Sequence, residues 1–280
     1  MTNSGSQLSG LIRNSKTLLK NPRMAREYLS YWGSKLTNSG RAVRKFPDGV
    51  MVTELSGFSE FHSCAEFVSP QEREFIYKRP MDEGEIIDVG ANLGIVSFML
   101  AERFPERVIH SFEPAPSTFR AFNANIELNS RANVRALQCA VADHDGEVSF
   151  SADPVGRATN SIAVSGGESV INVPSITLDS YVENNSIQNI AFLKVDVEGY
   201  ETLVFRGAKR VLARRQAAII YYEVCPEITI RAGFDPSLPT RMLVENGYRT
   251  YHLTEQASLE PVSVSRIQQT VLENWIALRS

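Results

Sequence analysis

The chain has 280 residues, of which 43% are apolar and 22% are charged, so it can bury a sizeable hydrophobic core. This length suits one large α/β domain with additions and is marginal for two domains. A net charge of −3 gives no general attraction for nucleic acids, and we expect no nucleic-acid partner. The three cysteines are widely spaced and form no C-x-x-C pair, which argues against a disulfide framework and a zinc site.

Positive charge is concentrated at the start of the chain. Residues 1–45 contain nine Lys and Arg residues and one Glu, a net charge of +8, which leaves −11 for residues 46–280. The spacing of apolar residues predicts one helix over residues 8–19, and Asn21 with Pro22 is typical of the start of a second helix. We interpret residues 1–45 as a basic, amphipathic helical extension of a main domain that covers residues 46–280.

Two interpretations of this extension stay open. Its helices either cover the main domain or lie against a membrane surface through residues 8–45, because basic amphipathic helices can bind lipid interfaces. No apolar run resembles a signal peptide or could span a membrane. We therefore expect a cytoplasmic protein, and any membrane contact would be peripheral and at the inner face.

The main domain is predicted to begin with a lead-in over residues 46–80. Within it, residues 49–55 and 58–67 read as short strands joined by turns. Ser69 and Glu72, three residues apart, are typical of a helix start with a capping box. We therefore expect a helix from that point to the end of the lead-in.

From Glu85 onward, short apolar strands alternate with amphipathic helices. We predict strands over residues 86–89, 108–112, 134–141, 192–195 and 217–224, helices over residues 93–103, 116–128, 179–184, 200–205 and 241–246, and a closing antiparallel pair over residues 248–253 and 275–278. Residues 145–178 are rich in turns, and we expect short strands or a flap there. This alternation implies an α/β, Rossmann-like fold with a mostly parallel sheet and helices on both faces.

A glycine-rich turn follows the first buried strand and opens a helix. Glycine lets the backbone approach a ligand closely, and free N–H groups at a helix start favour an anion such as a carboxylate. Asp88 is expected to orient the turn and to accept a hydrogen bond from a ligand ammonium group. The candidate cofactor-binding residues of this turn are Asp88, Gly90, Ala91, Asn92, Leu93 and Gly94.

Acidic residues also follow the second and third strands. Glu113, next to Pro114, lies 19 residues after the last glycine of the turn, where α/β nucleotide-binding folds place an acceptor for ribose hydroxyl groups. Asp143 is expected to accept a hydrogen bond from an adenine amino group, while Val141 and Ala142 line the adenine ring. These residues complete the expected binding site for a nucleoside-containing cofactor.

Two cofactors compete for this set of residues. A pyrophosphate-binding turn follows the pattern G-x-G-x-x-G, and Asn92 stands at the position of its second glycine. This departure disfavours NAD and favours S-adenosylmethionine. An NAD-linked dehydrogenase nevertheless stays an alternative.

A second acidic segment follows the fourth strand. Because the carboxyl ends of parallel strands meet at one edge of a sheet, we expect a convergence there of Asp88, Glu113, Asp143, Asp196 and Glu223. Carboxylates around a sulfonium cation are electrostatically favourable, and they also suit general-base chemistry or a divalent metal. A magnesium ion held by Asp196 and Glu223 is one option, and a reaction without metal is the other.

Six motifs in a fixed order carry a resemblance to a known family. They are IIDVGANLG (86–94), SFEPAP (111–116), AVADHDG (140–146), TNSI (159–162), ITLDSYV (176–182) and FLKVDVEGYETLVFRGA (192–208). In this order and spacing the chain resembles the FkbM family of S-adenosylmethionine-dependent O-methyltransferases. The resemblance implies a class I methyltransferase fold with a cofactor-binding core over residues 81–225, and it does not cover residues 1–60.

The resemblance also implies the reaction and the class of acceptor. Members of the family methylate hydroxyl groups of sugars or polyketides, so we expect a small-molecule, glycan or glycolipid acceptor and in-line displacement at the methyl carbon. The family often has a His soon after the acidic residue of the fifth strand, whereas Val224 follows that residue here. The candidates for the general base are Asp196, Glu198, Glu223 and His62.

Three further questions stay open at this point. Asn160 and Ser161 lie in the expected flap, where they either contact the acceptor or form a turn. A non-catalytic interaction module on the same fold is a third functional alternative, and the sequence does not indicate an oligomeric state.

Overall fold

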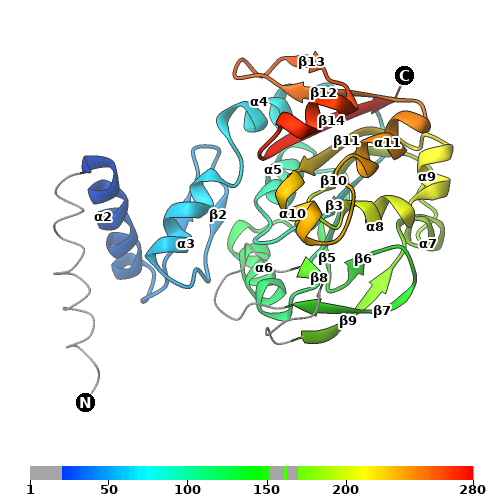
Figure 1. Cartoon of the computed structure of the whole chain (residues 1–280). Helices are drawn as coiled ribbons and strands as arrows, with labels where there is room; N and C mark the ends of the chain where they lie inside the picture. Colours follow the sequence, from blue (N-terminus) through cyan, green and yellow to red (C-terminus); the bar gives the residue numbers. More distant parts are fainter. Residues whose placement is uncertain (1–20, 152–160, 163–169, 280) are drawn as a thin grey trace. The chain divides into compact units, whose positions relative to one another are not determined.

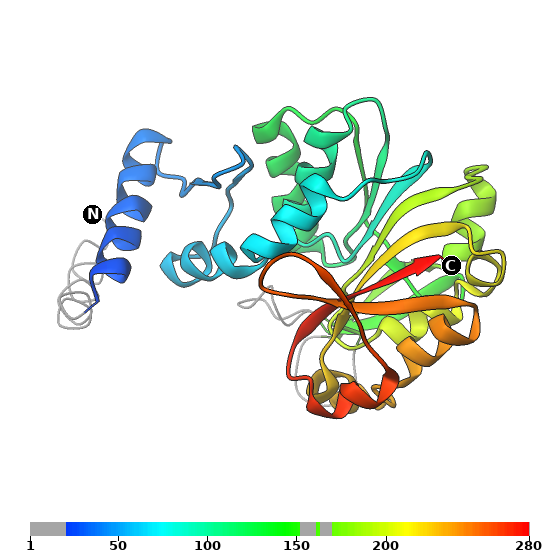
Figure 2. The same ribbon diagram turned by 90° about the horizontal axis from the view of Figure 1, so that it is seen from above.

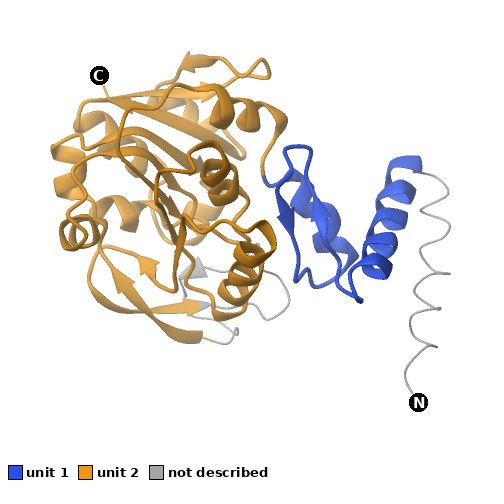
Figure 3. Cartoon of the chain, turned by 180° about the vertical axis from the view of Figure 1, so that it is seen from behind, with its two compact units in different colours: residues 1–67 blue, residues 68–280 orange. Residues whose placement is uncertain are grey.

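The computed structural model describes residues 21–151, 161–162 and 170–279. The chain forms two compact units, residues 1–67 and 68–280, shown in different colours in Figure 3. This division does not coincide with the boundary at residue 45 inferred from charge, and that boundary stays a prediction. The helix predicted over residues 8–19 and the flap residue Asn160 lie outside the described residues.

Unit 1 contains α2 (Pro22–Thr37), whose N-cap residue Asn21 accepts hydrogen bonds from the amides of Arg23 and Met24. A short antiparallel pair follows, formed by β1 (Arg44–Lys45) and β2 (Met51–Val52). The strand predicted over residues 58–67 is wrong, because this segment forms α3 (Phe58–Ser63) and the 3-10 helix η1 (Cys64–Glu66). Its buried residues, Phe61 and Cys64, are three apart, which is helical rather than strand spacing.

Unit 2 is built on an eight-stranded sheet with the order β13-β12-β14-β11-β10-β3-β4-β5. Its strands are β3 (Glu85–Val89), β4 (Ile109–Phe112), β5 (Val134–Leu137), β10 (Ile190–Val195), β11 (Ala217–Val224), β12 (Tyr248–Leu253), β13 (Leu259–Pro261) and β14 (Glu273–Arg279). The five strands from β5 to β11 are parallel, whereas β14 pairs antiparallel with β11, and β12 pairs antiparallel with β14. The predicted α/β fold with a closing antiparallel pair is confirmed.

Helices cover both faces of this sheet, as Figures 1 and 2 show. One face carries α4 (Pro70–Lys78), α5 (Ile95–Arg103) and α6 (Pro116–Asn129), and the other carries α7 (Leu178–Asn184), α8 (Glu201–Arg206), α9 (Lys209–Ala213) and α11 (Leu238–Glu245). The remaining helices of the unit are α10 (Pro226–Arg231) and the 3-10 helix η3 (Val264–Gln269). The predicted capping box of α4 is confirmed, because Ser69 and Glu72 exchange hydrogen bonds.

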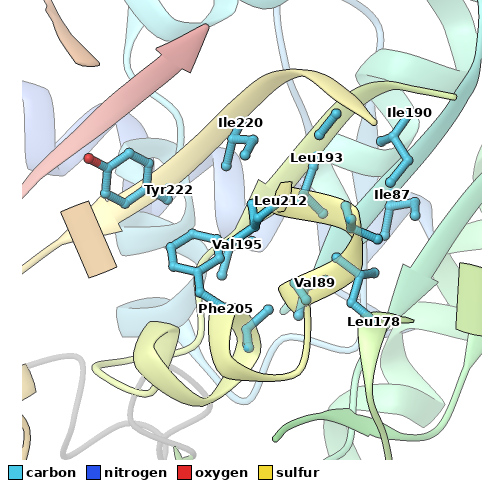
Figure 4. Packing of buried hydrophobic residues seen from close by; sticks show 14 of the residues in the cluster. Ile87, Val89, Leu178, Ile190, Leu193, Val195, Phe205, Leu212, Ile220 and Tyr222 are labelled. Atoms are coloured by element: carbon cyan, nitrogen blue, oxygen red, sulfur yellow. The ribbon is translucent and has the colours of Figure 1, made fainter. Parts of the chain in front are cut away.

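The main hydrophobic core lies between the sheet and the second group of helices. Strand residues such as Val89, Val195 and Tyr222 pack there against Phe205 of α8 and Leu212 of α9, as Figure 4 shows. All five side chains are almost completely buried. Because alternate residues of a strand face opposite sides, the neighbours of these strand residues point to the other face, towards α4 and α5.

The third predicted strand, over residues 134–141, is divided in two. Only β5 joins the large sheet, while β6 (Ala140–Val141) belongs to a four-stranded sheet with the order β6-β9-β7-β8. The other strands of that sheet are β7 (Gly146–Ser151), β8 (Ser161–Ile162) and β9 (Val170–Ile176). The expectation of short strands within residues 145–178 is confirmed for the described part of that segment. No helix in the described parts of the chain has the length and apolar character needed to cross a membrane.

Candidate active site

The glycine-rich turn at the end of β3 is tightly packed. Gly90 has a φ of +82°, and a Cβ atom added to it would lie 1.8 Å from the carbonyl oxygen of Asp196. Gly94 has a φ of +88°, and an added Cβ would lie 2.3 Å from the ring of Phe122. Both positions therefore require glycine, and the turn after β3 touches the turn after β10.

Most of the expected anion-binding amides of this turn are used inside the protein. The amides of Gly90 and Ala91 donate to the carbonyl oxygen of Phe112, and the amide of Asn92 donates to Oε2 of Glu113 at 3.0 Å. Asn92 itself has a φ of +51°, in the left-handed region. An incoming carboxylate would therefore have to use amides beyond these three or replace the carboxylate of Glu113.

Asp88 is completely buried beneath the turn. Its Oδ2 accepts a hydrogen bond of 2.6 Å from the hydroxyl of Ser97 in α5, and Nζ of Lys194 lies 3.3 Å from its Oδ1. Ser97 is also 2.9 Å from the hydroxyl of Ser111 on β4. Asp88 thus fixes the turn to the start of α5 and to β10, and its predicted contact with a ligand ammonium group stays a prediction.

Glu113 is buried at the end of β4. Its two carboxylate oxygens accept hydrogen bonds from the amides of Asn92 and Ala115. Burial raises the pKa of Glu113 to about 7, although these two hydrogen bonds act in the opposite direction. The carboxyl group of Glu113 therefore already binds the glycine-rich turn. A ribose hydroxyl that donates to this carboxyl group would have to do so in addition to the two amides.

The second acidic segment forms a turn that is stabilised by Glu201. Its Oε1 accepts hydrogen bonds from the amides of Val197 and Gly199 at 3.0 and 3.3 Å. Burial raises the pKa of Glu201 to about 7. Glu201 is therefore a structural residue of the turn. Asp196 and Glu198 are the carboxylates of this segment that remain as candidates for contact with a ligand.

Asp196, Glu198 and Glu223 are electrostatically linked at the carboxyl edge of the sheet. Burial, followed by repulsion from Asp196, raises the pKa of Glu198 to about 8 and that of Glu223 to about 11. Oε2 of Glu223 is buried and has no hydrogen-bond partner among the described residues. These are the properties of carboxyl groups whose combined negative charge exceeds the positive charge that Lys194 supplies beside Asp196.

Asp143 does not join this cluster in any recorded contact. It lies just after β6 of the smaller sheet, is exposed, and pairs with Nδ1 of His144 at 2.9 Å. Val141 is part of the main core, and the carbonyl oxygen of Ala142 packs against Gly207. The division of the third strand is the physical reason, because β6 leaves the large sheet. The predicted adenine contacts of these residues stay predictions.

The remaining predicted residues lie as follows. Ala91 and Leu93 are buried core residues of the turn, and Pro114 is half-buried beside Glu113. His62 belongs to α3 of unit 1, where its ring stacks on Phe58 with centroids 6.0 Å apart. Its predicted role as a base stays a prediction.

No feature of the described residues supports the magnesium ion proposed at Asp196 and Glu223. Within the described ranges, no group of three or more His, Cys, Asp or Glu side chains could hold a metal ion. In addition, Oδ2 of Asp196 already pairs with Nζ of Lys194 at 3.2 Å. We therefore assign no step of the reaction to a metal.

Two features of this edge were not predicted from the sequence. Lys194 is buried between Asp88 and Asp196, and these two carboxylates raise its pKa well above the usual range although burial alone would lower it. On β11, the hydroxyl of Tyr221 donates to Oε1 of Glu72 at 2.5 Å, and Asn274 donates to the same atom at 2.6 Å. The only sequence signal was a polar residue inside an otherwise apolar strand.

A comparison with known protein families shows which family the chain belongs to and which class of reaction it catalyses. Residues 88–250 match the family described as "Methyltransferase FkbM domain". The chain belongs to this family. It is therefore a methyltransferase, as the motifs predicted, and its fold is the Rossmann-like class I methyltransferase fold.

Several curated relatives are similar to this chain at low identity. The hexuronic acid methyltransferase AglP of Haloferax volcanii is 25% identical over 206 residues, which cover 70% of this chain and 80% of that protein. Methyltransferase 1 of Beauveria bassiana is 26% identical over 188 residues, 56% of this chain and 76% of the relative. The 31-O-demethyl-FK506 methyltransferase FkbM of Streptomyces tacrolimicus is 28% identical over 167 residues, 49% of this chain and 63% of the relative.

Solved structures of methyltransferases are also similar to this chain. Precorrin-6y C5,15-methyltransferase of Geobacter metallireducens has a TM-score of 0.43 and 12% identity, and the match covers 76% of this chain and 89% of that one. A putative O-methyltransferase of Klebsiella pneumoniae has a TM-score of 0.43 and 9% identity, with 77% and 83% covered.

Proposed function

We propose that this methyltransferase binds S-adenosylmethionine at the turn from Asp88 to Gly94 and transfers its methyl group to a hydroxyl group of a sugar-containing or polyketide acceptor. The observation that carries the proposal is the direct packing of Gly90 against the backbone of Asp196. It joins the candidate donor turn to the candidate acceptor-side carboxylates at one edge of the sheet. Two relatives support an oxygen acceptor by their names, a hexuronic acid methyltransferase and a 31-O-demethyl-FK506 methyltransferase.

The proposed reaction is an in-line displacement, and the charges at this edge are compatible with it. The acceptor oxygen attacks the methyl carbon, a new O–CH₃ bond forms, the S–CH₃ bond breaks, and S-adenosylhomocysteine leaves. Positioning the two reactants supplies up to about 7–11 kcal/mol of the barrier, and a base for the hydroxyl proton adds about 10²–10⁴-fold. Asp196 is our first candidate for that base. Glu223, with its pKa raised to about 11, holds its proton until a cation approaches.

Apolar side chains beside this edge support an acceptor with an apolar part. Val224, the last residue of β11, pairs with Glu273, the first residue of β14. Val271 and Leu272 precede that pair directly and are 82% and 59% exposed, and Ile230 of α10 is 62% exposed. A polyketide or a glycolipid would cover such side chains, whereas a small free sugar would not.

Binding of S-adenosylhomocysteine, measured by titration calorimetry, tests the donor half of the proposal. Asp88→Ala should abolish binding and Glu113→Ala should weaken it, and full affinity in both variants would refute the site. No binding to the wild-type protein would reject the function itself. Binding of NADH in its place would favour the dehydrogenase.

Transfer of a labelled methyl group to candidate extracts, followed by identification of the product, tests the acceptor half. A labelled product with a methyl ether is expected. A product methylated on nitrogen or carbon would contradict the oxygen acceptor. Donor binding without any labelled product across sugar, glycolipid and polyketide acceptors would favour a non-catalytic module.

We also propose that α2 contacts a membrane surface. Leu29 and Leu36 are 71% and 85% exposed on this helix, and Arg23 and Arg26 are exposed on it as well. Exposed leucines next to arginines are the composition of an interfacial helix that binds anionic lipid. Co-sedimentation with vesicles that contain an anionic lipid should be lost in a Leu29→Asp/Leu36→Asp variant. Equal sedimentation of the variant would refute this contact.

A further inference from the structure

Lys194 is a buried cation that none of the predicted roles uses. Its Nζ donates a hydrogen bond of 2.9 Å to the carbonyl oxygen of Gly90. The same atom lies 3.3 Å from Oδ1 of Asp88 and 3.2 Å from Oδ2 of Asp196. Its side chain is 6% exposed, whereas that of Asp196 is 32% exposed. One ammonium group therefore contacts both turns of the candidate site from below.

The position of Lys194 follows from the register of the sheet. Lys194 of β10 is paired with Asp88 of β3 on one side and with Tyr221 of β11 on the other. Paired residues of neighbouring strands point to the same face, so these three side chains form a row that faces away from the main core. The hydroxyl of Ser97 extends the row to α5 through Asp88.

The chemistry of an ammonium group suits this place. It is compact, it carries three donors, and here it has three oxygen atoms around it. Asp88 is fully buried, so it needs a cation nearby, while the exposed part of Asp196 is available to a ligand. The carbonyl oxygen of Gly90 belongs to the donor turn itself.

We propose that Lys194 is a positioning residue that holds the carboxylate of Asp196 in a fixed place relative to the donor turn. This inference rests on the proposed function. In the proposed arrangement, Asp88 and the carbonyl oxygen of Gly90 hold the ammonium group of Lys194. The ammonium group in turn orients Asp196 towards the methyl group that is transferred. Lys194 itself touches neither donor nor acceptor.

The test uses S-adenosylmethionine labelled with ¹³C in its methyl group, because the chemical shift of the bound methyl group reports on a neighbouring carboxylate and needs no acceptor. Asp196→Asn should change the methyl resonance of the bound donor. Lys194→Met should cause a change of the same kind, and Lys194→Arg, which keeps the charge, should restore part of the wild-type shift. The affinity for S-adenosylhomocysteine should fall by less than about tenfold in Lys194→Met, since the donor turn keeps its other bonds.

A control and a second variant keep the test decisive. Lys209→Met removes a lysine from the exposed surface of α9 and should leave the methyl resonance unchanged. If Lys194→Met does not fold because Asp88 loses its cation, Lys194→Gln keeps a hydrogen-bond donor and replaces it in the comparison. Folding of each variant is checked by circular dichroism and thermal melting.

The possible outcomes separate the two proposals. If the wild-type protein does not bind the donor, the proposed function has failed and Lys194 has no donor to serve. If donor binding is retained and the methyl resonance of Lys194→Met or Lys194→Gln equals that of the wild type, the positioning role is overturned while the function stands. Once an acceptor is known, the same variants should lower kcat by about 100-fold, the usual cost of a 1 Å misplacement, with a much smaller change in KM for the donor.

Discussion

Replacement of Gly90 by alanine should disrupt the candidate site by steric contact alone. The new Cβ would lie 1.8 Å from the carbonyl oxygen of Asp196, a distance that forces the two turns apart. A left-handed φ costs a non-glycine residue about 1–2 kcal/mol, and overpacking adds about 1–3 kcal/mol. We therefore expect a loss of about 2–5 kcal/mol in the free energy of unfolding, against a typical total of about 5–15 kcal/mol.

Gly233 provides a matched control for this substitution. Its φ of +86° is close to the +82° of Gly90, but an added Cβ would have no atom within 4 Å. Gly233→Ala should therefore show only the backbone cost, about 1–2 kcal/mol. Urea denaturation measures both variants, and titration calorimetry with S-adenosylhomocysteine should show at least about tenfold weaker binding for Gly90→Ala only. Equal stability and equal binding in the two variants would falsify the packing argument.

Three further predictions concern charge and surface. Burial raises the pKa of Glu198 from 4.5 to about 8, so the folded protein holds this proton more tightly than the unfolded chain does. The melting temperature without ligand should therefore fall as the pH rises from about 5 to 8. A rise of the melting temperature over this range would contradict the raised pKa of Glu198. Glu72→Gln should cost about 1–3 kcal/mol in urea denaturation, because a half-buried carboxyl group that accepts hydrogen bonds from Tyr221 and Asn274 is lost, and a change below about 0.5 kcal/mol would show that these bonds are unimportant. Below their micelle concentrations, n-alkyl glucosides should bind more tightly as the alkyl chain becomes longer. Val271→Ser/Leu272→Ser should abolish this dependence on chain length, whereas Val244→Ser should not. An unchanged dependence in the double variant would refute the proposed apolar acceptor surface.

Local patterns in the sequence were sufficient for much of the fold. The capping box at Ser69 and Glu72, the turn with Gly90 and Gly94, and the alternation of strands and helices all depend on residues that are near one another in the chain. The helix over Phe58–Ser63 shows the limit of this approach. Its apolar residues Phe58 and Phe61 are three apart, which is a helical spacing, but two apolar positions in six residues are too few to establish a period.

Features that depend on pairing between distant strands could not be predicted in this way. The role of Lys194 follows from the register that places it beside Asp88, which lies 106 positions earlier in the sequence. The same holds for Asp143, because the departure of β6 from the large sheet is set by its pairing with β9. A sequence motif names the residues of a site, whereas strand register decides which of them meet.

The acidic edge of the sheet is suited to a ligand whose charge disappears in the reaction. Burial and mutual repulsion raise the pKa values of Glu198 and Glu223 to about 8 and about 11, so a nearby cation would be stabilised and would favour their ionised forms. S-adenosylmethionine carries a sulfonium, and S-adenosylhomocysteine carries a neutral thioether in its place. In the proposed reaction the carboxylates therefore attract the donor more strongly than the product. The loss of the sulfonium charge then weakens product binding. The proton that leaves the acceptor hydroxyl is taken up by a carboxylate of this edge, which reduces the repulsion among the carboxylates that stay ionised.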